Sequence, residues 1–271
     1  MSETGKSLLT EAPPSHPPAS LLEKLFQTLY RVSGKRKSVD AFLSPMLSHR
    51  NYLPVVTAEQ VVPDFDRSRV QLVDLPRGEW ATPLIDTLTV VKAAIGFRSA
   101  KVLEIGSYKG ATAKLIAENT PESTHVWPLD VVPEHGSAYR GTPLEARIHR
   151  LVGAVSYDLL KEHGPFDLIF VDADHDYESV WHHSACAFAL LAPGGVILWH
   201  DYHNKNYLHG MNGVPEGLDA VRKATGKSIV SIEGTMVCIY SEFPGWETSR
   251  VSDSTVGSEM DPWKNSKLPG H

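Results

Sequence analysis

Apolar and polar segments alternate regularly between residues 80 and 244. Short apolar runs, which suit strands buried on both faces, are separated by longer segments with apolar residues at helical spacing. The predicted strands are residues 101–105, 125–130, 148–152, 167–172 and 195–199. The predicted helices are residues 82–94, 111–119, 177–191 and 216–224. In the first helix, we expect the apolar side to consist of Leu84, Ile85, Leu88, Val91 and Ala94.

This order of elements predicts the fold class. Strands that alternate with helices form a mainly parallel sheet with helices on both faces. Two closing segments, residues 229–232 and 236–240, follow the last helix closely and read as a hairpin. We therefore predict a Rossmann-like, doubly wound α/β fold whose mainly parallel sheet ends in an antiparallel C-terminal edge hairpin.

The rest of the chain divides into flanking segments. Residues 1–19 are rich in proline and small polar residues, a composition typical of a disordered lead. Residues 20–79 are interpreted as a helical and irregular extension, in which a capping box at Ser20 opens a short helix. The apolar stripe of that helix needs a partner, which could be the core, an active-site lid or a second subunit in a homodimer. Residues 80–244 form the predicted domain, and the polar residues 245–271 a flexible tail.

Charge and composition exclude several classes of partner. The formal net charge is −6, so the basic surface that drives nucleic-acid binding is not expected. No segment is apolar and long enough for a membrane span or a signal peptide. Cys186 and Cys238 lie in apolar segments and are expected to be buried free thiols. Together these features predict a cytoplasmic protein that binds neither nucleic acid nor membrane.

The sharpest local motif is a glycine turn between a strand and a helix. Glu104 lies in the strand that ends before Gly106, and Gly110 precedes the helix, which gives the pattern Glu-x-Gly-x-x-x-Gly. Glycines in such a turn let a ligand approach the backbone closely. Asp130 ends the following strand, where an acid in Rossmann-like folds takes the ribose hydroxyls of a ligand. Dinucleotide sites prefer GxGxxG, so this spacing favours S-adenosylmethionine (SAM), which has no phosphate.

A second motif places acids and histidines at the ends of two apolar strands. The first strand delivers Asp172 and His175, and the strand after Gly194 delivers His200 and Asp201. Carboxylates that converge from neighbouring strand ends repel one another unless a cation compensates, and a divalent metal does so with oxygen ligands. The alternative is that Asp172 and Asp201 cap helices or turns.

From Val102 to Tyr240 the chain resembles the class I SAM-dependent methyltransferases. Within them it is similar to the small-molecule O-methyltransferases that include macrolide-sugar, caffeoyl-CoA and catechol enzymes. The resemblance implies that Glu104, Gly106 and Ser107 line the methionine end of SAM and that Gly110 also binds the cofactor. It also implies that Asp130 holds the ribose and that Ser156 approaches the adenine.

The resembling families bind magnesium at this place, which here corresponds to Asp172, His200 and Asp201. His200 departs from the pattern, because imidazole suits zinc, manganese or iron better than magnesium. Either His200 is not a ligand, or the metal differs, or no metal binds. His175 stands where those enzymes carry a lysine base, and an imidazole suits proton abstraction near neutral pH. The expected catalytic residues are therefore His175 and Asp172, with His200 as the second candidate for the base.

The predicted function is methyl transfer from SAM to a hydroxyl of a small molecule, such as a sugar or a natural-product intermediate. A divalent metal is expected to assist the transfer, and Mg²⁺ is the first candidate. The alternatives are a metal-free methyltransferase with a histidine base, a SAM-binding protein without catalysis, and a nicotinamide-dependent oxidoreductase. The metal-free enzyme would stay active in EDTA. The SAM-binding protein would transfer no methyl group, and the oxidoreductase would bind NAD.

Overall fold

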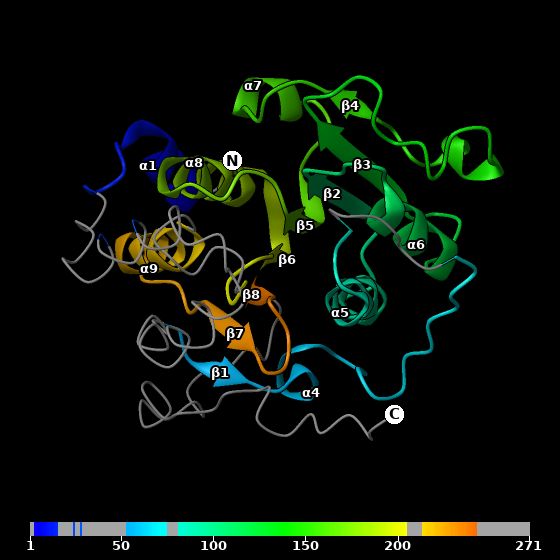
Figure 1. The fold of residues 1–271 in the computed structure, drawn as a ribbon, viewed down its shortest axis with the longest axis horizontal. Coiled ribbons are helices and arrows are strands. Elements are labelled where there is room, and N and C mark those ends of the chain that lie inside the picture. The colour runs from blue at the N-terminus through cyan, green and yellow to red at the C-terminus, as the bar shows by residue number, and fades with distance from the viewer. Residues whose placement is uncertain are drawn as a thin grey trace.

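The structure is a computed structural model, and it describes residues 3–15, 24, 28, 53–74, 81–204 and 213–242. These residues build one twisted sheet with helices packed on both faces (Figure 1). Of the predicted helix that starts at Ser20, only Lys24 and Thr28 are described, and both are helical. The tail 245–271 and the centre of the loop after β6 lie outside the described residues. The homodimer that this helix could form therefore stays a prediction.

The sheet has eight strands in the order β1-β7-β8-β6-β5-β2-β3-β4. β8 runs antiparallel to β6 and β7, and every other pair of described strands is parallel. The strands are β1 (Val55–Val56), β2 (Lys101–Ile105), β3 (His125–Asp130), β4 (Leu151–Val152), β5 (Phe166–Val171), β6 (Leu191–Trp199), β7 (Val230–Ile232) and β8 (Cys238–Ser241). The predicted Rossmann-like fold is confirmed, and the closing hairpin forms as β7 and β8.

The helices separate into two layers that cover opposite faces of the sheet (Figure 1). One layer consists of α1 (Glu3–Thr10), α7 (Tyr157–Leu160), α8 (Tyr177–Leu190) and α9 (Val214–Thr225). The other consists of α4 (Ala58–Val61), α5 (Leu84–Gly96) and α6 (Ala111–Asn119), with the short 3₁₀ helix η2 (Pro143–Ala146) against α6. Side chains alternate between the two faces along each strand, so Leu103 and Ile105 face the first layer and Val102 the second.

Three local expectations are wrong. Residues 3–10 form helix α1 instead of a disordered lead, because Leu8 is buried and Gly5 lies directly against the backbone of Ala189 in α8. On α5, Val91 and Ala94 of the expected apolar side are buried, but Leu84 and Ile85 are exposed, and the buried face also carries Asp86 and Thr87. Strand β1 was not predicted, and it lies outside the β7–β8 hairpin at the edge of the sheet.

Other features agree with the sequence. Cys186 and Cys238 are buried free thiols. Within the described part of the chain, no helix is long and apolar enough to cross a membrane.

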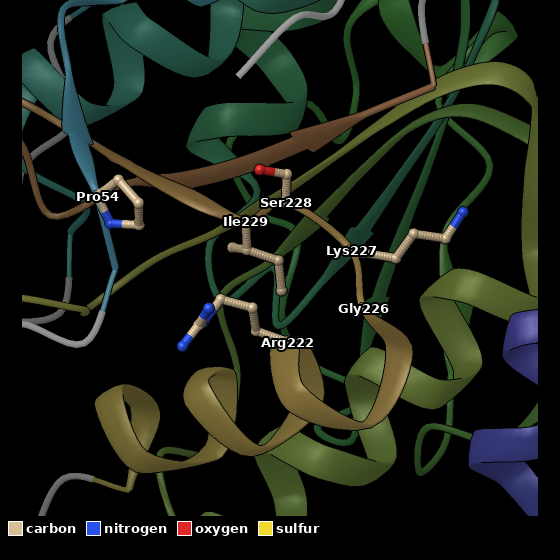
Figure 2. A pocket seen from close by; sticks show the side chains of 6 residues that line it. All are labelled: Pro54, Arg222, Gly226, Lys227, Ser228 and Ile229. Carbon is tan, nitrogen blue, oxygen red and sulfur yellow. The ribbon is translucent and has the colours of Figure 1, made fainter. Parts of the chain in front are cut away.

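A cavity of about 170 Å³ opens at the amino end of β7, lined by Pro54, Arg222, Gly226, Lys227, Ser228 and Ile229 (Figure 2). Arg222 and Lys227 point in opposite directions from its rim, so their charges do not converge on one ligand (Figure 2). The Arg222 guanidinium pairs instead with Asp219 at 3.1 Å, and the Lys227 ammonium lies 3.5 Å from Glu242. The acids and the glycine turn singled out in the sequence lie at the opposite, carboxyl edge of the sheet.

One buried histidine makes stability depend on pH. His183 lies in α8 beside the exposed His182, and burial lowers the pKa of His183 to about 4. Its pKa in the unfolded chain is about 6.5, so between these values the unfolded state binds the extra proton and stability falls as pH falls.

We expect the free energy of unfolding to drop by about 2 kcal/mol more between pH 7.5 and pH 5 in the wild type than in His183→Gln. Urea unfolding of both proteins at the two pH values measures this difference. Equal drops in the two proteins would contradict a neutral, buried His183.

Candidate active site

The glycine turn begins where β2 ends. Gly106 and Ser107 both donate backbone hydrogen bonds to the Leu129 carbonyl, at 2.9 and 3.1 Å, which fastens the turn to the end of β3. Gly106 has a φ of +88°, and a Cβ there would lie 2.0 Å from the backbone carbonyl oxygen of Asp172. Only glycine fits such a conformation and such a close approach. Gly110, with a φ of +78°, then begins α6.

Glu104 places a buried carboxylate beneath this turn. It is 2% exposed, and its Oε2 has no hydrogen-bond partner among the described residues. Burial, together with the charges of Asp172 and Asp130, raises the pKa of Glu104 well above its usual value. A buried polar atom without a partner is unusual in a folded protein and indicates a place where a ligand donor can bind. The site therefore favours a ligand that is positively charged near Glu104.

Asp130 ties the turn to the loop that follows β3. Its carboxylate accepts hydrogen bonds from the backbone N–H groups of Tyr108 at 2.7 Å and Val132 at 2.9 Å, and lies 2.9 Å from Nδ1 of His135. Burial alone would raise the pKa of Asp130, but these hydrogen bonds lower it below its usual value. The carboxylate is therefore ionised at neutral pH and held at the carboxyl edge of the sheet.

Ser156 lies on the same edge, in the segment after β4. Its hydroxyl accepts a hydrogen bond of 3.3 Å from the backbone N–H of Leu159 and caps α7. The segment reaches this place because Gly153 bonds to the Asp130 carbonyl at 3.0 Å. A role near the adenine stays a prediction.

The residues after β6 go to opposite faces of the sheet. Leu198 packs with the α5 layer and Trp199 with the α8 layer. If this alternation continues past the strand end, His200 turns toward α5 and Asp201 toward the loop before α8. The contacts of the two side chains agree with that assignment.

His200 is enclosed by carboxylates. Its Nε2 lies 3.0 Å from Asp86 of α5, and its Nδ1 lies 3.0 Å from Asp172. Burial alone would lower the pKa of His200, but the charge of Asp172 and the hydrogen bonds to Asp172, Asp201 and Asp86 raise it well above its usual value. Carboxylates engage both ring nitrogens of His200, and the group of side chains that could hold a metal among the described residues is Asp172, His175 and Asp201. The predicted ligand role of His200 stays a prediction.

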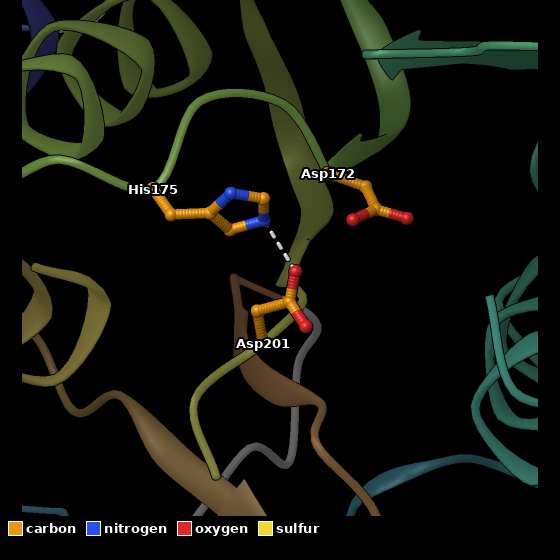
Figure 3. Close-up of side chains that lie close together, drawn as sticks. All are labelled: Asp172, His175 and Asp201. Atoms are coloured by element: carbon orange, nitrogen blue, oxygen red, sulfur yellow. Dashed lines mark ion pairs between the residues drawn. The ribbon is translucent and has the colours of Figure 1, made fainter. Parts of the chain in front are cut away.

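The cluster that could hold a metal is Asp172, His175 and Asp201, whose ligand atoms all lie within 4.8 Å of one another (Figure 3). His175 points at Asp201 and forms an ion pair through Nε2, while the Asp172 carboxylate stands on the other side (Figure 3). Burial raises the pKa of Asp201, but the hydrogen bonds to His175 and His200 outweigh it and keep that pKa low. Burial alone would lower the pKa of His175, but the hydrogen bond to Asp201 and the charges of Asp201 and Asp172 raise it above its usual value.

Asp201 itself has an unusual backbone. Its φ is +65°, a conformation that non-glycine residues rarely adopt and that is frequent at functional sites. The residue is 5% exposed, and its carboxylate also accepts a hydrogen bond from Asn204. The carboxylate is thus fixed from several directions before any ligand arrives.

The glycine turn and this cluster are in direct contact through Asp172. The Asp172 backbone N–H donates to the Ile105 carbonyl at 2.8 Å, and the Asp172 carbonyl faces Gly106. A ligand on the turn and a second ligand on Asp172, His175 and Asp201 would therefore meet at this edge of the sheet.

Residues 103–202 match the family model described as a methyltransferase domain. The matched segment begins in β2 and ends after Asp201, so it contains the glycine turn and the whole acidic cluster. This segment is therefore similar to methyltransferase domains. The resemblance found in the sequence is confirmed at this level.

The chain is also similar to several solved structures. An O-methyltransferase from Bacillus cereus in complex with SAH is 18% identical, with a TM-score of 0.46, over 75% of this chain and 97% of that chain. A SAH-bound methyltransferase from Podospora anserina is 19% identical, with a TM-score of 0.49, over 74% and 94% of the two chains.

A third structure is the O-methyltransferase of tomaymycin synthesis from Streptomyces achromogenes in complex with SAM. It is 18% identical, with a TM-score of 0.47, over 75% of this chain and 96% of that chain. None of these likenesses assigns a role to a residue of this chain. No curated protein matches the sequence.

Two side chains of the site were not predicted, and both come from outside the matched segment. Thr82 donates a hydrogen bond of 3.0 Å to Asp172, and Asp86 holds His200. The sequence pattern did not single out Asp86, because the expected apolar side of this helix does not include it.

Proposed function

We propose that the methyltransferase domain uses SAM to methylate a hydroxyl group of a small molecule. The observation that carries this proposal is that Asp172 belongs to the Asp172–His175–Asp201 cluster and that its backbone carbonyl also lies against Gly106 of the glycine turn. The turn suits a methyl donor, and the cluster suits an acceptor oxygen that must be oriented and deprotonated. Their contact brings the two reactants to one edge of the sheet.

The residues of the turn fit SAM. Gly106 leaves room that a Cβ would fill, and the Glu104 Oε2 atom offers an acceptor to a ligand ammonium. Asp130 and Asp172, whose charges act on Glu104, make the edge negative, which favours a ligand that carries a sulfonium and an ammonium. A dinucleotide would bring a pyrophosphate to this negative edge, so the same charges oppose it. Asp130 and Ser156 remain the candidates for the ribose and the adenine.

The donor set of the cluster fits a divalent metal. Two carboxylates and one imidazole suit Mn²⁺, Fe²⁺ or Zn²⁺ better than Mg²⁺, which prefers oxygen ligands. A metal held by Asp172, His175 and Asp201 would orient the acceptor hydroxyl and lower its pKa.

In the mechanism, SAM supplies an electrophilic methyl group on a sulfonium sulfur. The chain aligns the acceptor oxygen with that methyl group and takes up the hydroxyl proton. Without a metal, Asp201 orients the imidazole of His175, as an acid orients a histidine base in hydrolase triads, and the pair can hold the proton. With a metal on His175 and Asp201, the proton of the acidified hydroxyl would leave to solvent instead. His200 bridges Asp86 and Asp172 and keeps the Asp172 carboxylate in place.

A metal-free methyltransferase with His175 as base is the second candidate. It is favoured by the ion pair between His175 and Asp201, which forms from protein groups alone. A chelator distinguishes the two, because activity survives EDTA only in the metal-free enzyme.

The test of the proposed function is methyl transfer from methyl-labelled SAM to a panel of catechols, phenols and sugars, with matched amines as controls and Mn²⁺ present. We expect the label on an oxygen of at least one hydroxyl acceptor. Label on amines alone would overturn the proposed acceptor class. SAM binding without transfer to any acceptor would favour a non-catalytic SAM-binding protein.

A further inference from the structure

A buried tyrosine outside the predicted site lies directly beside the glycine turn. The loop after β3 is fastened to the turn by two backbone hydrogen bonds of 2.8 Å, from Gly136 to Tyr108 and from Ala138 to Lys109. The next residue, Tyr139, is 2% exposed.

Two glycines make room for this side chain. A Cβ at Gly110 would lie 2.3 Å from the Tyr139 ring, and a Cβ at Gly136 would lie 2.5 Å from its hydroxyl oxygen. Both glycines have a positive φ, of +78° and +91°. The close fit fixes the ring against the turn, which is the condition for a hydroxyl that is to recognise a ligand with precision.

The Tyr139 hydroxyl has no hydrogen-bond partner among the described residues, and neither has the Glu104 Oε2 atom. Both side chains belong to the α5 and α6 face of the sheet, since Tyr139 packs with that layer and Glu104 shares the face of Val102. Burial and the nearby Glu104 charge raise the pKa of Tyr139 to about 12, so the phenol is a donor at neutral pH.

The two unpaired atoms are complementary but do not bond to each other. Each buried polar atom without a partner destabilises the fold, and such atoms are rare unless a ligand or water satisfies them. A ligand that satisfies both must offer an acceptor to the phenol and a donor to the carboxylate. The carboxylate and ammonium of an α-amino acid provide this pair.

We propose that Tyr139 is a further SAM-binding residue, whose hydroxyl donates a hydrogen bond to the carboxylate of the methionine end while Glu104 accepts one from the ammonium. This inference rests on the proposed function, because it presumes that SAM occupies the turn. It assigns the loop after β3 a part in cofactor recognition that the sequence did not predict.

The test is titration calorimetry of the wild type and Tyr139→Phe with two ligands, SAH and 5′-methylthioadenosine. The second ligand keeps the adenosine and the sulfur but lacks the amino-acid end. We expect the variant to bind SAH roughly tenfold to a hundredfold more weakly, as for a lost hydrogen bond to a charged group, with unchanged affinity for 5′-methylthioadenosine.

A buried tyrosine at the other end of the sheet is the matched control. The Tyr240 hydroxyl bonds to Glu242 at 3.1 Å, and Tyr240→Phe is expected to leave both affinities unchanged. Unchanged SAH binding by Tyr139→Phe would overturn the inference, and so would an equal loss for both ligands, which indicates a structural role. A wild type that binds neither ligand would instead refute the proposed function.

Stability gives a second readout. Removal of a hydroxyl without a partner inside the protein should not lower the urea midpoint of the ligand-free protein. A clearly lower midpoint for Tyr139→Phe would show that the hydroxyl is bonded within the fold, against the inference.

Discussion

Asp86→Ala is expected to lower the free energy of unfolding by about 3–5 kcal/mol, the range for breaking a buried ion pair on one side. Asp86 is 1% exposed, and one carboxylate oxygen lies 3.0 Å from Nε2 of His200. The other accepts the backbone N–H of Met236, also at 3.0 Å. The substitution therefore leaves a buried imidazolium with a missing partner and a backbone N–H without an acceptor.

Urea unfolding at pH 7.5 measures this loss, and Asp86→Asn is the matched variant. Asparagine keeps an acceptor for Met236 and the shape of the side chain, so we expect it to recover part of the stability. A free energy for Asp86→Ala within 1 kcal/mol of the wild type, on the order of one hydrogen bond, would show that the Asp86–His200 contact is not formed as described.

Asp172→Ala and His175→Ala are each expected to weaken Mn²⁺ binding at least roughly a hundredfold, because loss of an outer-shell partner alone typically costs 10–100-fold. The structure places both residues with Asp201 in one cluster. Calorimetry or the paramagnetic resonance signal of Mn²⁺ measures the affinity without an acceptor. Mn²⁺ is the suitable probe because the set includes an imidazole.

Asp174→Ala is the control, since Asp174 is an exposed acid in the same loop and lies outside the cluster. We expect it to bind Mn²⁺ like the wild type. Equal, weak binding by all four proteins would reject the metal site and leave the metal-free mechanism with His175 as base. Retained binding in His175→Ala would show that the ligand set is not the one that the structure brings together.

The central elements could be predicted closely from sequence. The bounds of β2, α6 and β3 agree with the expected residues 101–105, 111–119 and 125–130, because strong apolar patterns end at glycine or polar residues. The same patterns delivered Asp172 and Asp201 to one edge, since the carboxyl ends of parallel strands meet there.

Other features depend on contacts that no local pattern encodes. Either His175 or His200 could have been the third member of the cluster. The outcome depends on the face of the sheet to which each side chain points after its strand ends. His200 turns away because Asp86, distant in sequence, offers it a buried carboxylate. Helix α1 was missed because its composition is polar, although Gly5 and Leu8 give it a surface that fits α8. Tyr139 carries no motif, and only packing against Gly110 and Gly136 shows its position.

The most direct measurement is titration calorimetry of the purified chain with SAM and, separately, with NAD, both in the presence of EDTA. We expect SAM to bind without metal and NAD not to bind, and we expect Glu104→Gln to weaken SAM by roughly tenfold or more, as for loss of a charged hydrogen-bond partner. NAD binding in place of SAM would contradict the assignment of the glycine turn, and so would SAM binding that is indifferent to Glu104.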